Sequence, residues 1–145
     1  MRRGGSDDGT AVIEFLVVAV LLLVPVLAAA LTIVGVQAAA LASTQAVRQA
    51  GRAFMIADDE SSGRRSAQLA SEVALNDQGF SAPAGALTIT CAGRCLAPST
   101  HVQVRLAWDV DLPWMPGFLS DWLPSVPITA QQSFSVDTYR SGLET

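Results

Sequence analysis

Residues 15–36, FLVVAVLLLVPVLAAALTIVGV, decide the fold of this chain. The stretch contains no charged residue, and as an α-helix it would be roughly 33 Å long, because each helical residue rises about 1.5 Å. The hydrocarbon core of a bilayer is about 30 Å thick, so length and composition together predict one membrane-spanning helix. Pro25 lies inside the stretch, where it removes a backbone hydrogen bond and predicts a kink of the kind that membrane helices tolerate.

The helical pattern continues beyond this stretch. Residues 37–56 are rich in alanine and glutamine and contain no proline, so we expect one long helix over residues 10–58, with its transmembrane part at 15–36. Its outer half should carry an apolar stripe along one side. The stripe consists of Leu41, Val47, Ala50 and Phe54, opposite Gln45, Arg48, Gln49 and Arg52. Small residues between Gly35 and Gly51 would let another helix approach closely, although alanine is equally the strongest helix former.

A small α+β domain is expected after the long helix, over residues 59–145. The charged segment DDESSGRR at 58–65 interrupts the apolar pattern, and residues 65–76 then predict a short amphipathic helix with Leu69 and Val73 on its apolar side. Beyond Pro83, apolar and polar residues alternate in three segments, at 87–91, 102–110 and 128–137. The predicted fold class is therefore α+β, with a long N-terminal helix, a short amphipathic helix and a small three-stranded antiparallel sheet that a helix can cover.

The two cysteines of the chain, Cys91 and Cys95, fall in the loop between the first two predicted strands. An even cysteine count outside the cytoplasm predicts one disulfide, and closing so short a loop would contribute roughly 2 kcal/mol. A redox or metal site is the competing interpretation. A metal would need more ligands than two cysteines, and the one histidine of the chain, His101, is expected on a solvent-facing strand position.

The densest group of aromatic residues lies between the second and third predicted strands, in LPWMPGFLSDWLP at 112–124. Trp114, Phe118 and Trp122 are four residues apart, and Pro116 could open one short helix around them. Tryptophan is enriched at membrane interfaces because its ring is apolar and its N–H is polar. We expect these three residues to contact the outer leaflet or a partner subunit, with a lid over the small sheet as the alternative.

Several classes of function are disfavoured by the sequence. Formal net charge is −4 and every basic residue is arginine, so the basic footprint that phosphate neutralisation requires is missing and we expect no nucleic-acid partner. We find no glycine-rich phosphate loop, no metal-binding His-Glu-x-x-His motif and no pair of carboxylates suited to acid–base catalysis. We therefore expect no enzyme, and with it no catalytic residue, metal, cofactor or small-molecule substrate.

One acidic residue, Glu14, stands at the head of the apolar stretch. A functional role is expected for it, because inserting a carboxylate at the centre of a membrane helix costs roughly 2.5–3.5 kcal/mol of free energy. Glu14 follows Gly9 by five residues and precedes the aromatic Phe15. This junction resembles the leader junction of type IV prepilins, and most closely that of the TadE-like pseudopilin family of tight-adherence (Flp-type) pilus systems. The resemblance covers about the first 40 residues, and the remainder is similar in layout.

The resemblance implies that a prepilin peptidase cuts after Gly9, which makes residues 1–9 a leader peptide and Thr10 the mature N-terminus. It also implies that the Glu14 carboxylate pairs with the amine of a neighbouring subunit's first residue, since each buried charge lowers the other's desolvation cost. The implied role is that of a minor pilin or pseudopilin-like subunit in assembly of a tight-adherence type IV pilus or a related secretion apparatus. The implied partners are the membrane, the prepilin peptidase, other pilin or pseudopilin subunits and the pilus assembly platform.

The expected location is the cell membrane, crossed once, with the N-terminus cytoplasmic and the C-terminal domain extracytoplasmic, where the chain could join a pilus. Arginine counts on the two sides of the span do not decide this orientation, because Arg2 and Arg3 precede it and Arg48 and Arg52 follow it. The orientation rests on the cysteine pair and the β-rich region, which suit an oxidising exterior, and on the resemblance.

An ordinary signal peptide is the alternative interpretation. Residues 15–27 are short enough for its apolar region, and Ala28-Ala29-Ala30 offers a cleavage site. The product would be a secreted or membrane-tethered binding module that starts near Leu31. Against this interpretation, Glu14 lies at the head of the apolar region and the helical pattern runs past Ala30 without a break.

Overall fold

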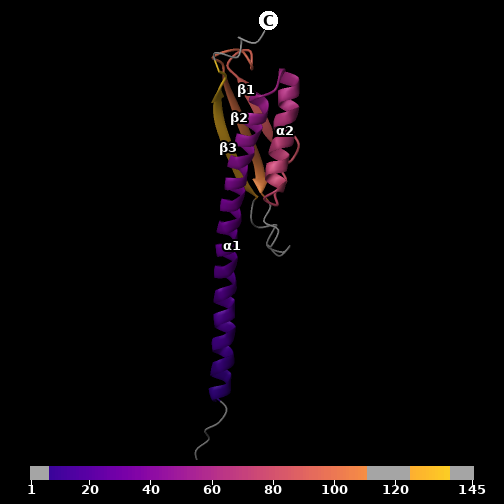
Figure 1. The fold of residues 1–145 in the computed structure, drawn as a ribbon. Helices are drawn as coiled ribbons and strands as arrows, with labels where there is room; N and C mark the ends of the chain where they lie inside the picture. Colours follow the sequence, from indigo (N-terminus) through magenta and orange to yellow (C-terminus); the bar gives the residue numbers. More distant parts are fainter. Residues whose placement is uncertain (1–6, 111–124, 138–145) are drawn as a thin grey trace, which may run out of the picture. The chain divides into compact units, whose positions relative to one another are not determined.

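The computed structural model describes residues 7–110 and 125–137, and its elements are drawn in Figure 1. Two helices are followed by three strands: α1 (Asp7–Met55), α2 (Glu60–Asn76), β1 (Leu87–Cys91), β2 (His101–Val110) and β3 (Val126–Ser135). The predicted α+β class is thereby confirmed, and the described elements lie within a few residues of the predicted ones. Two compact units make up the chain, Met1–Gly35 and Val36–Thr145, and each is described by itself.

The first unit contains the apolar half of α1. The large apolar side chains of residues 12–34 are 48–73% exposed, and they lie on all sides of the helix. The helix is long and apolar enough to cross a membrane. It continues through Pro25 without ending there.

In the second unit, the last five turns of α1 belong to the core. The buried positions recur every three or four residues and carry mostly small side chains: Ala39, Ala42, Ser43, Ala46, Val47, Ala50 and Phe54. Of the four residues in the predicted apolar stripe, Val47, Ala50 and Phe54 are buried, whereas Leu41 is 68% exposed. The small residues let α1 approach its neighbours closely, so the helix buries its alanine face and not the face with the largest apolar side chain.

Helix α2 begins earlier than predicted because Asp59 caps it. The Asp59 carboxylate accepts a hydrogen bond from the Ser62 backbone N–H at 2.9 Å, which satisfies one of the unpaired N–H groups of the first turn. The buried residues of α2 are Gly63, Ala67, Ser71 and Leu75. Leu69 and Val73, which form the apolar side of the helix predicted over residues 65–76, are 62% and 59% exposed.

Close packing explains why α2 buries its small side chains. A Cβ added to Gly63 would lie 3.0 Å from the Phe54 ring and 3.2 Å from the Phe54 carbonyl oxygen. A larger residue at this position would therefore push the two helices apart. Glycine here lets α2 pack directly on the end of α1, and this orientation turns Leu69 and Val73 away from the core.

The sheet has the order β1-β2-β3 and both pairs are antiparallel. Cys91 pairs with Val102 at one end of β1, and Val102 pairs in turn with Phe134 of β3. Buried and exposed residues alternate along the whole of β2. Its buried side chains are Val102, Val104, Leu106, Trp108 and Val110. The other side of β2 begins with His101, which is exposed as predicted and opens a mostly polar face.

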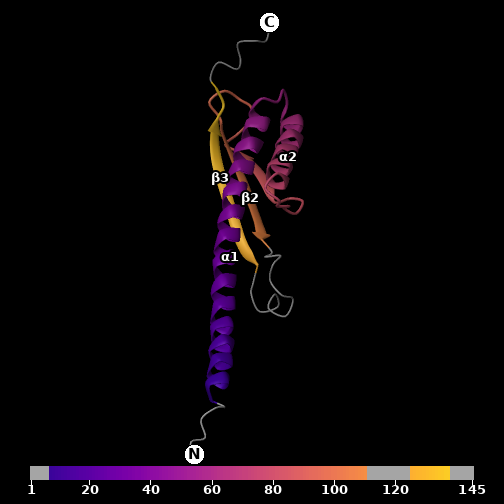
Figure 2. The same cartoon turned by 60° about the horizontal axis from the view of Figure 1, so that its bottom comes forward.

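Specific contacts fix α1 on the apolar face of the sheet, and Figure 2 shows the upper part of α1 in front of β2 and β3. The Trp108 indole N–H of β2 donates to the Ser43 hydroxyl of α1 at 3.0 Å. Further along α1, a Cβ on Gly51 would overlap the Phe134 ring of β3, so this ring lies directly on the α1 backbone. The core of the second unit is therefore a layer between one helical pair and three strands.

Candidate interaction surfaces and the disulfide corner

The predicted processing residues lie at the beginning of α1. Because the helix begins at Asp7, the Gly9–Thr10 peptide bond lies in its first turn, where backbone N–H groups lack intrahelical partners. Glu14 is exposed and Phe15 is 72% exposed. No residue in the described part of the chain forms an ion pair or hydrogen bond with the Glu14 carboxylate. A partner for this charge would have to come from outside these residues.

A second surface lies between the two helices of the second unit. A groove there is lined by residues of α1, of α2 and of the turn that follows α2, which are Gln45, Gln49, Leu69, Ala70, Val73, Ala74, Asp77 and Gln78. We call it the helical groove. Leu69 and Val73 give it an exposed apolar wall, and Leu41 adds a third exposed apolar side chain one helical turn before Gln45. The sequence placed these three residues on the apolar sides of two helices but did not indicate that they form an exposed surface.

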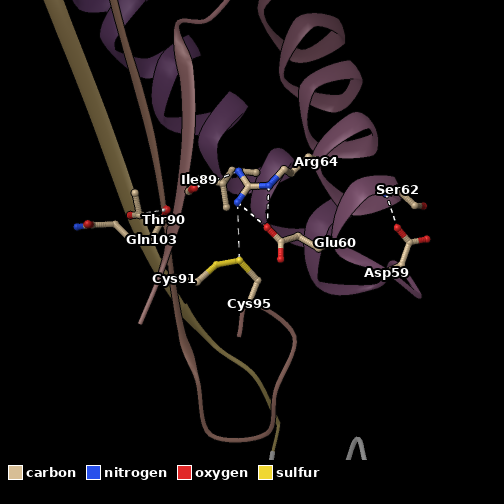
Figure 3. Close-up of polar contacts among 9 residues, drawn as sticks. All are labelled: Asp59, Glu60, Ser62, Arg64, Ile89, Thr90, Cys91, Cys95 and Gln103. Carbon is tan, nitrogen blue, oxygen red and sulfur yellow. Dashed lines mark hydrogen bonds and ion pairs between the residues drawn. A yellow bond between two sulfur atoms is a disulfide. The ribbon is translucent and has the colours of Figure 1, made fainter. Parts of the chain in front are cut away.

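The two cysteines form the third feature, which we call the disulfide corner. Cys91 at the end of β1 is joined to Cys95 in the following loop, which is the pairing expected from the sequence. Cys95 is buried, at 5% exposure, and Cys91 is half-buried. Figure 3 shows Arg64 and Glu60 of α2 beside this bridge, so the corner combines a helix, a strand and a loop.

Arg64 is the residue of this corner that sequence reasoning missed. Its Nε and Nη2 atoms donate to the Glu60 carboxylate at 3.0 and 2.8 Å, and Nη1 donates to the Ile89 carbonyl oxygen at 3.2 Å. The spacing of four residues between Glu60 and Arg64 could have signalled the ion pair. The contact with β1 joins residues that are far apart in the sequence, so no local pattern indicates it.

Asp59 is the N-cap of α2, and its carboxylate accepts two hydrogen bonds. The Ser61 hydroxyl donates to its carboxylate at 2.6 Å and the Ser62 backbone N–H at 2.9 Å. Both bonds stabilise the charged form, so the hydrogen bond from Ser61 first, and then that from Ser62, holds the pKa of Asp59 below its ordinary value.

The aromatic residues that the sequence analysis named as a candidate interface cannot be placed beside these surfaces. Trp114, Phe118 and Trp122 lie outside the described residues. In the described ranges 7–110 and 125–137, no group of three or more histidine, cysteine, aspartate or glutamate side chains is placed to hold a metal ion.

Comparisons of the chain with protein-family models, with curated proteins and with solved structures found no match.

Proposed function

We propose that this chain is a pseudopilin-like membrane subunit that takes part in assembling a tight-adherence type IV pilus or a related secretion apparatus. The observation that carries the proposal is the position of Glu14. It stands at the head of an uncharged, largely apolar and exposed helical stretch, five residues after Gly9, and its carboxylate has no partner among the described residues. In a membrane such a charge requires a counter-charge, and a neighbouring subunit's amine would supply one.

The division of α1 supports the same role. Its first half exposes apolar side chains on every side, while residues 39–54 supply the core of a separate small unit. One helix can thus hold the chain in a bilayer, or pack among neighbouring helices, while it remains part of a folded domain. The helical groove offers that domain an apolar surface for a partner subunit.

Replacing Glu14 by glutamine tests the proposal. The change keeps the size and hydrogen bonding of the side chain but removes the negative charge that would pair with a neighbouring subunit's amine. The leader should therefore still be removed, while pilus assembly should fall. Glu72→Gln is the matched control, because it removes one exposed carboxylate from α2 and should leave assembly unchanged. Equal assembly by the Glu14→Gln variant and the unaltered chain would contradict the proposed role of Glu14.

The alternative is the secreted or tethered binding module with a signal peptide cleaved near Ala30. It predicts a mature chain that lacks most of the apolar half of α1. In the structure, α1 runs unbroken from Asp7 through Ala30 to Met55, so this cut would fall within a continuous helix. The position of the mature N-terminus separates the two candidates.

A further inference from the structure

The two sulfurs of the disulfide corner have different surroundings. The Arg64 Nη2 atom lies 3.8 Å from the Cys95 sulfur, whereas Cys91 is the more exposed of the pair. Figure 3 shows the guanidinium directed at Cys95 and not at Cys91. Cys91 is therefore the less buried end of the disulfide, and Cys95 is buried beside a cation.

Arg64 is held in this position by contacts on two sides. Two of its nitrogens donate to the Glu60 carboxylate and a third donates to the Ile89 carbonyl oxygen of β1. These bonds restrict the side chain, so its positive charge stays at Cys95. Glu60 offsets part of this charge, and Arg94, next to Cys95 in the loop, adds an exposed positive charge of its own.

We propose that the Cys91–Cys95 disulfide is a site of thiol–disulfide exchange with an external dithiol, in which Cys91 receives the attacking thiolate and Cys95 departs. Exchange is faster when the attacked sulfur is accessible and when the leaving thiol has a low pKa. A nearby arginine lowers the pKa of a cysteine thiol by stabilising its thiolate. Both conditions assign the same roles to the two sulfurs.

The exchange proceeds in two balanced steps. A thiolate of the dithiol bonds to the Cys91 sulfur, the Cys91–Cys95 bond breaks, and its electron pair remains on Cys95 beside Arg64. The second thiolate of the dithiol then attacks the mixed disulfide at the dithiol's own sulfur and releases the Cys91 thiolate, which takes a proton from water. The dithiol is oxidised to a disulfide and the protein disulfide is reduced, and the reverse sequence closes the bridge again.

The site of attack can be mapped on the unaltered full chain in detergent. The protein is incubated with reduced glutathione, quenched with acid, digested and analysed by mass spectrometry. Glutathione should be found mainly on Cys91. Equal labelling of both cysteines, or labelling mainly of Cys95, would overturn the proposal.

The role of the cation is tested by Arg64→Gln, with Arg65→Gln as the matched control that removes the neighbouring exposed charge. Reduction of the Arg64→Gln variant should be several-fold slower, because loss of the cation raises the pKa of the leaving thiol and a thiol of higher pKa leaves more slowly. The Arg65→Gln variant should be reduced at the original rate. An unchanged or faster rate for Arg64→Gln would count against the proposal.

A direct titration separates this effect from a general loosening of the corner. In the Cys91→Ser variant the remaining thiol of Cys95 is alkylated at a series of pH values, with and without Arg64→Gln. The alkylation midpoint should rise when Arg64 is replaced by glutamine and return towards its original value with Arg64→Lys. Identical midpoints in all three would overturn the assignment. If a variant fails to fold, the mapping on the unaltered chain still decides.

Discussion

Ser43 and Trp108 show how single residues fix the core of the second unit. Ser43 is fully buried, accepts the Trp108 indole N–H at 3.0 Å and donates its own hydroxyl to the Ala39 carbonyl oxygen at 2.8 Å. Every polar atom of this pair is thereby satisfied, although the side chains come from a helix and a strand. The edge-on contact between Trp108 and Phe80, with ring centres 5.9 Å apart, holds the indole from another side.

Ser43→Ala is expected to lower the free energy of unfolding by about 1–3 kcal/mol, because the buried indole N–H loses its acceptor. Thr44→Ala is the matched control. Thr44 is the next residue, is exposed, and makes the same kind of bond to the Ala40 carbonyl oxygen at 2.9 Å. Its replacement should change stability by less than about 0.5 kcal/mol. Chemical denaturation followed by circular dichroism measures both, and equal effects would contradict the account.

The Asp59 cap predicts a dependence of stability on pH. Because the pKa of Asp59 is lowered in the folded state, its contribution is fully present above the unfolded value, near 3.8, and is lost as the pH falls through the lower folded value. Asp59→Ala should therefore destabilise the protein at pH 7. The difference between variant and unaltered chain should shrink as the pH falls below 3.8. A constant difference over this range would show that the charge of the cap does not matter.

At the scale of elements, α2 is the most informative helix because its two faces invert the usual pattern. It buries Gly63, Ala67 and Ser71 together with Leu75, and it exposes Leu69 and Val73. The small residues permit close contact with α1, and the larger ones form the wall of the helical groove. The exposed residues of the groove contribute little to the core, and under the proposed function the groove would be a surface for a partner subunit.

The double change Leu69→Ser and Val73→Ser should leave the free energy of unfolding almost unchanged, because both side chains are already more than half exposed. It should reduce pilus assembly if a partner subunit occupies the groove. Leu75→Ala on the same helix is the contrasting variant, and it should cost about 2–5 kcal/mol because Leu75 is buried. A large loss of stability from the first change, or normal assembly with it, would contradict this interpretation.

Elements with a strong period were predictable from the sequence. Apolar and polar residues alternate along the whole of β2, and α1 contains a long uninterrupted apolar stretch. Each pattern indicates the type and the approximate extent of its element without any knowledge of the tertiary packing. The faces of α2 and the position of Leu41 were not predictable, because hydrophobicity favours burying leucine while the close approach of two backbones requires small residues. The contact between Arg64 and the disulfide depends on tertiary packing of a helix on a strand, which no local pattern contains.

At the scale of the whole molecule, the two compact units differ in what they leave exposed. The unit Met1–Gly35 exposes an apolar helix that suits lipid or neighbouring helices, and the unit Val36–Thr145 has a core of its own. A chain of this kind can be anchored by one unit and recognised by the other. The proposed function depends on the first unit keeping its apolar helix after processing, because a cut near Ala30 would remove most of it.

The mature N-terminus tests this central claim most directly. Protein from cells that carry the prepilin peptidase is purified and sequenced from its N-terminus, alongside a Gly9→Leu variant whose bulky side chain should block cleavage. The account predicts that the mature chain begins at Thr10 and that the Gly9→Leu variant remains nine residues longer. A mature chain that begins near Leu31, or a Gly9→Leu variant that matures normally, would contradict the prepilin interpretation and favour the signal peptide.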